Sequence, residues 1–96
     1  MLQIEKNADG HSLKIALNGE LDSMTSPQLE REVQDVAEFD EVVLDLKDLA
    51  YTSSAGLRVI MGLKRRMGAR PLKFENIGPE VREVLDMTGS SKLLGL

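Results

Sequence analysis

The chain has 96 residues, of which 42% are hydrophobic and 29% are charged, and its net charge at pH 7 is −4. This length allows a single domain, 1–96, and this composition is that of a globular protein rather than a disordered or collagen-like one. The absence of cysteine and the presence of only one histidine and three aromatic residues exclude disulfides and thiolate metal sites, and they argue against a nucleic-acid-binding protein.

The opening residues follow neither a membrane-spanning nor a secretory pattern. No apolar run approaches the roughly 20 residues of a membrane-spanning helix. The stretch from Met1 to Lys6 lacks the charged and apolar regions of a signal peptide. We therefore expect an unprocessed cytoplasmic protein without a membrane partner.

Apolar and polar residues alternate in 2–7 and again in 12–18, the period of half-buried strands. Asp9-Gly10 between them is a typical hairpin turn, so the chain is predicted to open with an antiparallel β-hairpin. A helix is predicted to begin near residue 26, either through a capping box of Thr25 with Gln28 or through Ser26 before Pro27. Its apolar positions predict an end between 37 and 39.

The run 42–46 is short, β-branched and nearly continuous, and this predicts a central strand covered on both faces. Lys47-Asp48 predicts a polar loop after it. A helical pattern follows from residue 55 to Met67, and Gly68 is expected to end it.

A short strand is predicted from Leu72 to about Ile77, and a third helix from Pro79 to Gly89. The segment 90–96 is expected to be a final short strand or a tucked tail. Strands separated by single helices pair in parallel through right-handed crossovers. The fold class is therefore α/β: a single mixed β-sheet, formed by a β-hairpin and then alternating α and β elements, with helices packed against it.

The stretch Thr52-Ser53-Ser54-Ala55-Gly56 joins the predicted central strand to the start of a helix. The first N–H groups of a helix are free and lie at its positive end, so a phosphate on a serine there would be well accommodated. The simpler interpretation is that Ser53 or Ser54 is an ordinary N-cap and that Gly56 only permits close packing.

Three segments in register resemble the anti-sigma factor antagonist family, the STAS domain. They are the Thr-Ser-Ser-Ala-Gly-Leu stretch at 52–57, Gly-Glu-Leu-Asp at 19–22, and Leu-Asp-Met-Thr-Gly at 85–89. The order of predicted elements agrees over nearly the whole chain. Aligning on Gly56 places the family's phosphorylated serine at Ser54, with Ser53 as the alternative acceptor. Family members often have Asp where this chain has Ser53, and many continue beyond Leu96 with a further helix.

The resemblance implies a partner switch in the control of transcription, with no enzymatic activity and no cofactor. The unmodified domain would bind an anti-sigma factor that is also a serine kinase, and this would free a sigma factor. Phosphorylation of Ser54 would end the complex, and a PP2C-type serine phosphatase would reset it. In addition to Ser54, the residues expected to contact the partner are Asp22, Thr52, Ser53, Ala55, Gly56 and Arg58.

Several of these residues have simpler interpretations. Asp22 is either a neighbour of the Ser54 loop or a turn carboxylate, and Arg58 is either a phosphate contact or a solvated helix charge. His11 in the hairpin turn is too isolated for a phosphocarrier or a Ser-His-Asp hydrolase. The basic residues Lys64, Arg65, Arg66 and Arg70 are either a patch for nucleic acid or an acidic partner, or helix C-terminal charge.

Two other function classes remain open from the sequence. One is a small phosphocarrier or enzyme that uses the hydroxyl loop with the three carboxylates at Asp22, Asp45 and Asp48. The other is a scaffold subunit of a signalling complex with an unmodified loop. The oligomeric state, the sigma factor, the kinase and the stimulus are not encoded in any pattern of the chain.

Overall fold

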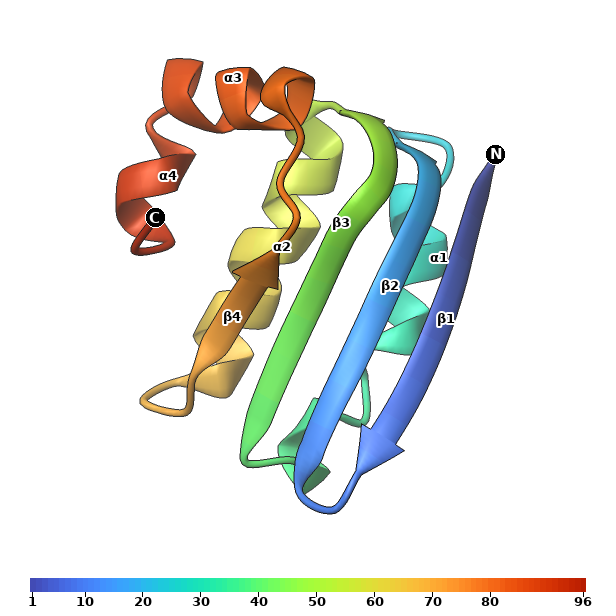
Figure 1. The fold of residues 1–96 in the computed structure, drawn as a ribbon, viewed down its shortest axis with the longest axis vertical. Coiled ribbons are helices and arrows are strands. Elements are labelled where there is room, and N and C mark those ends of the chain that lie inside the picture. The colour runs from blue at the N-terminus through green and yellow to red at the C-terminus, as the bar shows by residue number, and fades with distance from the viewer.

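The alternating segments at the start of the chain form the predicted hairpin. The computed structural model describes residues 1–96, and in it β1 (Leu2–Asp9) pairs antiparallel with β2 (Ser12–Leu21). The sheet has four strands in the order β1-β2-β3-β4, and both pairings that involve β3 are parallel (Figure 1). This mixed sheet with an antiparallel edge is the predicted fold class.

The central strand β3 (Glu41–Thr52) is longer than predicted, and the polar loop predicted at Lys47-Asp48 is wrong. The register against β2 shifts between Ala16 and Asn18 and again between Gly19 and Glu20. At each shift β3 carries one extra residue, so two consecutive side chains of β3 become exposed. The bulges break the alternation that marks a strand in the sequence while the hydrogen-bonded pairing continues.

The helices depart from prediction at two places. The helix predicted to reach residues 37–39 is divided into α1 (Ser26–Glu32) and the 3-10 turn η1 (Val36–Glu38). The capping box does not form, because the Thr25 hydroxyl donates to the Glu20 carbonyl at 2.8 Å and the Gln28 amide reaches the Leu2 carbonyl at 3.0 Å. The segment predicted as a strand or tail is the short helix α4 (Ser90–Leu93), with Leu94 buried after it.

The other elements agree with prediction: α2 (Ser54–Met67) ends at Gly68, β4 (Leu72–Glu75) follows, and α3 (Pro79–Met87) begins after Gly78. Figure 1 shows α1 and α2 on the same face of the sheet, with α3 across the end where β2 and β3 finish. No helix is long and apolar enough to cross a membrane.

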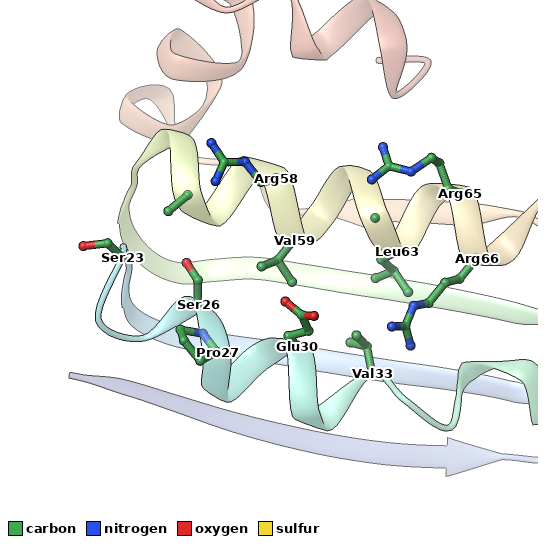
Figure 2. Close-up of a pocket in the computed structure, with 12 residues that line it drawn as sticks. Ser23, Ser26, Pro27, Glu30, Val33, Arg58, Val59, Leu63, Arg65 and Arg66 are labelled. Carbon is green, nitrogen blue, oxygen red and sulfur yellow. The ribbon is translucent and has the colours of Figure 1, made fainter.

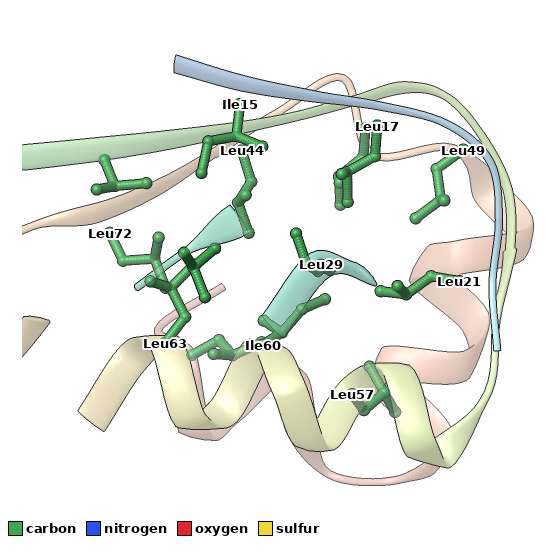
Figure 3. Packing of buried hydrophobic residues seen from close by; sticks show 14 of the residues in the cluster. Ile15, Leu17, Leu21, Leu29, Leu44, Leu49, Leu57, Ile60, Leu63 and Leu72 are labelled. Atoms are coloured by element: carbon green, nitrogen blue, oxygen red, sulfur yellow. The ribbon is translucent and has the colours of Figure 1, made fainter. Parts of the chain in front are cut away.

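The core lies between the sheet and α1 and α2, where apolar side chains from both layers interlock (Figure 3). The opposite face of the sheet carries polar side chains, among them Lys14, which pairs with Glu75 at 3.1 Å across β2 to β4. The prediction that 42–46 is covered on both faces is therefore wrong. Only the alternate residues Val42, Leu44 and Leu46 are fully buried.

Arg70 holds the ends of two helices together. Its guanidinium donates to the carbonyls of Val36 at 3.0 Å and Phe39 at 2.7 Å, and also to those of Met67 and Arg66 at the end of α2. It therefore caps free carbonyls of η1 and α2 at once. Arg70 is a structural residue, separate from the basic surface that includes Arg65 and Arg66.

Candidate functional site

The site is built where two parallel strands end side by side. Leu21 of β2 and Thr52 of β3 are register partners, and the Ser53 N–H donates to the Leu21 carbonyl at 2.9 Å. Ser53 is the N-cap of α2, and its carbonyl accepts the N–H of Leu57 at 3.0 Å. The first turn of α2 is thus held rigidly over the carboxyl edge of the sheet, where sites in α/β folds are usually formed.

The two serines of this turn are in different environments. The hydroxyl of Ser53 is buried and has no hydrogen-bond partner, and it makes no capping bond to the helix. Ser54 is the first helical residue and is exposed. Only Ser54 therefore offers an accessible hydroxyl, and it lies beside the N–H groups of the first helical turn, which have no acceptor within the helix.

Gly56 allows this turn to approach the strands. A Cβ atom at this position would lie 2.5 Å from Thr52 Oγ1, 2.7 Å from Leu21 Cγ and 2.7 Å from the Leu21 carbonyl oxygen. All of these atoms belong to the ends of β2 and β3, which are fixed in the sheet. A residue with a side chain at 56 would push the start of α2, and with it Ser54, away from the sheet.

Asp22 follows β2 directly and therefore lies at the same edge of the sheet as Ser53. Its carboxylate accepts the backbone N–H groups of Met24 at 2.9 Å and Thr25 at 3.1 Å, and also the Thr25 hydroxyl. These bonds, first among them the one from the Thr25 N–H, lower the pKa of Asp22. Asp22 thus orders the turn before α1, and it forms no hydrogen bond with either serine.

The remaining residues expected at a partner divide by exposure. Thr52 is completely buried and Gly56 is buried, so these two residues support the loop from the protein interior. Arg58 lies one turn after Ser54 on α2 and is exposed, while Ala55 is half-buried. Asp22 and Ser53 are half-buried like Ala55, so the accessible surface of this set is formed mainly by Ser54 and Arg58.

The structure does not bring together the groups that a hydrolase or phosphocarrier would need. His11 lies before the first residue of β2, at the opposite end of the parallel strands from Ser54. Asp45 precedes Thr52 by seven strand residues, about 20 Å at the usual rise, and its carboxylate is bonded to Asn76 at 3.0 Å. Asp48 lies between them in β3. No group of three or more acidic or histidine side chains is arranged to hold a metal ion.

A groove continues from this site between α1 and α2. It has a volume of about 800 Å³, it begins near Ser23 and Ala55, and it runs along both helices to Arg66 (Figure 2). The basic residues of α2 are visible in the sequence but the groove is not, because only the tertiary structure places α1 beside them. The only sequence feature that could have indicated the groove is the combination of apolar and basic residues along α2.

Comparison with known proteins agrees with the fold. The family model described as "Mlab, STAS domain" matches residues 4–95. An anti-sigma F factor antagonist of Paenibacillus polymyxa is 31% identical over 97% of this chain and 84% of that protein. The anti-sigma-B factor antagonist of Bacillus subtilis is 25% identical over 99% of this chain and 90% of that protein.

Solved structures show the same fold. That of an anti-sigma factor antagonist from Mycobacterium paratuberculosis superposes with a TM-score of 0.87 at 23% identity, over 97% of this chain and 82% of that one. The Bacillus cell fate determinant SpoIIAA in its phosphorylated form superposes with a TM-score of 0.73 at 22% identity, over 99% of this chain and 86% of that one.

Proposed function

Because this chain belongs to the STAS domain family, we propose that it is an anti-sigma factor antagonist controlled by phosphorylation of Ser54. In its unmodified form it binds an anti-sigma factor that is also a serine kinase, and a sigma factor is thereby released. The relatives that carry the name of anti-sigma factor antagonist support this proposal, since each matches nearly the full length of the chain. The chain itself is a kinase substrate and a binding partner rather than an enzyme.

The chemistry is a phosphoryl transfer to the one accessible hydroxyl of the site. The kinase moves the γ-phosphoryl group of ATP to Ser54 Oγ, the hydroxyl loses its proton, and ADP leaves. A PP2C-type serine phosphatase later hydrolyses the ester and releases inorganic phosphate. We propose a cytoplasmic location for this cycle, because its partners are regulators of sigma factors.

The single observation that carries the choice of Ser54 is the contrast with its neighbour. Ser54 is exposed at the first residue of α2, whereas the Ser53 hydroxyl is enclosed by the protein. A kinase can reach the first hydroxyl without moving the backbone. Ser53, which the sequence leaves as an alternative, becomes accessible only if the start of α2 moves away from β2.

Phosphorylation at Ser54 acts on the interface rather than on the fold. The phosphate adds a charge of about −1.5 to −2, and at a helix N-terminus this charge is stabilised by free N–H groups. In a complex built around a neutral hydroxyl the same charge has to lose its water. An unpaired charge buried at an interface costs several kcal/mol, so affinity falls by about 100-fold or more.

Intact-mass measurement tests the assignment. Each anti-sigma factor kinase encoded in the same genome is purified and incubated with this chain and ATP. We expect one kinase to add a single phosphate, and we expect the addition to disappear in Ser54→Ala and to persist in Ser53→Ala. Modification that survives Ser54→Ala, or no modification by any of these kinases, contradicts the proposal.

A further inference from the structure

Three arginines along α2 have no acidic partner in the chain. Arg58, Arg65 and Arg66 are exposed, and none of them takes part in any of the ion pairs of the structure. The protein carries 16 acidic residues and a net charge of −4, so this lack of pairing does not come from a shortage of carboxylates. These arginines form a local cationic surface on an otherwise acidic molecule.

All three arginines line the groove between α1 and α2, which we call the arginine groove. Its inner surface includes the apolar side chains of Val33 from α1 and Val59 and Leu63 from α2. In Figure 2 Arg66 reaches toward α1, whereas Arg58 and Arg65 project from the side of α2 that is turned away from α1. Val33 and Leu63 are buried, so the apolar surface open to a partner is that of the half-buried Val59. The groove thus combines a small apolar contact with basic side chains, a combination that suits an acidic amphipathic segment.

The spacing of the arginines specifies the occupant further. Arg58 and Arg65 are seven residues apart, which is about 10 Å along the helix and nearly the same face of α2, and Arg66 is turned by about 100° from Arg65 toward α1. A helix laid along the groove presents side chains with the same repeat. Carboxylates at such positions can each meet a guanidinium, which binds carboxylates through two parallel hydrogen bonds.

The wall of the groove formed by α1 leaves the three arginines free to bind carboxylates of a partner. Glu30 of α1 lines the groove but forms no ion pair with the arginines. The groove is also open along its length, with about 800 Å³ of space, so it suits an elongated segment better than a small compact ligand. Its end at Ala55 lies directly beside Ser54.

We propose that the arginine groove binds an acidic amphipathic helix of the anti-sigma factor kinase, with acidic side chains on the arginines and an aliphatic side chain against Val59. This inference rests on the proposed function for the identity of the partner. The groove is continuous with the Ser54 turn, so a kinase that holds Ser54 at its active site is positioned to place a second element along α2.

A charge-reversal experiment tests the groove at its end remote from Ser54. The variant Arg65→Glu with Arg66→Glu is compared with Lys47→Glu with Lys92→Glu, which has the same net charge and alters exposed lysines that form no ion pair. Binding to the kinase that modifies Ser54 is measured by calorimetry at about 50 mM and about 500 mM salt. We expect at least a 10-fold loss at low salt for the arginine variant only, and equal affinities for both variants would overturn the proposal.

A second arm does not depend on any kinase. Two synthetic helical peptides of about 18 residues share one leucine face and carry glutamate or lysine at the positions that face the arginines. We expect the glutamate peptide to shift amide NMR signals of α1 and α2, and the lysine peptide to do so only with the Arg65→Glu, Arg66→Glu chain. No shift with the glutamate peptide, or equal shifts with both peptides, overturns the groove proposal.

The two arms separate the proposals from one another. If no kinase modifies Ser54, the proposed function fails while the peptides still test the groove. If Ser54 is modified but the arginine variant binds the kinase as the wild type does, the function stands and the groove proposal fails. Should the reversed charges disturb the end of α2, Arg65→Gln with Arg66→Gln removes the cations alone, and it is expected to show a smaller loss of affinity in the same direction.

Discussion

Gly56→Ala tests whether close packing of α2 on the strand ends positions Ser54. In an exposed helix this substitution would stabilise the protein by up to about 1 kcal/mol, because alanine has the higher helix propensity. Here the new Cβ would lie 2.5 Å from Thr52 Oγ1 and 2.7 Å from the Leu21 carbonyl oxygen. The Leu21 carbonyl is a backbone group and cannot withdraw without disturbing the pairing of Leu21 with Thr52, and the Thr52 side chain is completely buried. Overpacking of this kind costs about 1–3 kcal/mol, and it outweighs the propensity gain.

Gly62→Ala is the matched control on the same helix. A Cβ at 62 would meet only the end of the Arg65 side chain at 3.8 Å, so it has room. For a domain of this size each kcal/mol shifts the unfolding midpoint by about 4–8 °C. Net of the propensity gain, we take the loss in Gly56→Ala as about 1–2 kcal/mol. We therefore expect thermal unfolding to fall by about 4–16 °C in Gly56→Ala and to rise by a few degrees, about 2–6 °C, in Gly62→Ala.

Circular dichroism at 222 nm provides the melting curves for the two variants. The rate at which the kinase phosphorylates Ser54 provides a second readout, which should fall in Gly56→Ala because the start of α2 has moved. If the two alanine variants have the same stability, the close approach at Gly56 is not a constraint. The argument that the sheet edge fixes Ser54 would then be refuted.

The structural role of Arg70 and the contribution of two carboxylates to stability are tested by one substitution with its control and by one pH series. Arg70→Lys keeps the charge but loses the fork that caps η1 and α2, so we expect a loss of about 2 kcal/mol in urea unfolding; Arg58→Lys, the control, should change stability by less than about 0.5 kcal/mol. The pKa of Asp45 is lowered, mainly by the Asn76 amide, and the pKa of Glu41 is lowered, mainly by Lys73. A carboxyl whose pKa is lowered in the folded state stabilises the protein at pH values above its unfolded-state pKa. The free energy of unfolding should therefore decline as pH falls below about 4, with a shallower slope in Asp45→Asn. An unchanged slope in Asp45→Asn would show that this carboxylate does not contribute.

The sequence predicts the fold well where local pattern and tertiary environment agree. The hairpin, α2, β4 and α3 follow from alternation, helical spacing and the glycines that end them. The prediction failed at Lys47-Asp48 because a bulge places two polar side chains in succession without ending the strand. It also failed at 33–39, where the helical spacing continues while the backbone changes to a 3-10 turn.

The candidate site shows a similar division. The position of the Ser53-Ser54 turn at a strand-to-helix junction was predictable, and so was the proximity of Asp22. The family resemblance favoured Ser54 and left Ser53 as the alternative, whereas the burial difference between the two adjacent hydroxyls could not be predicted from the sequence. The role of Arg70 was equally hidden, since the carbonyl groups of Val36 and Phe39 are more than 30 residues away in the sequence.

The central claim is that a charge on Ser54 breaks the partner complex and leaves the fold intact. Calorimetric titration of the kinase with the unmodified chain, the Ser54-phosphorylated chain and Ser54→Asp tests it directly, with thermal unfolding of each chain measured in parallel. We predict an affinity loss of about 100-fold or more for the phosphorylated chain, a smaller loss for Ser54→Asp, and unfolding midpoints that stay equal or rise slightly. Equal affinity of the phosphorylated and unmodified chains, or a loss of affinity accompanied by unfolding, would contradict the account.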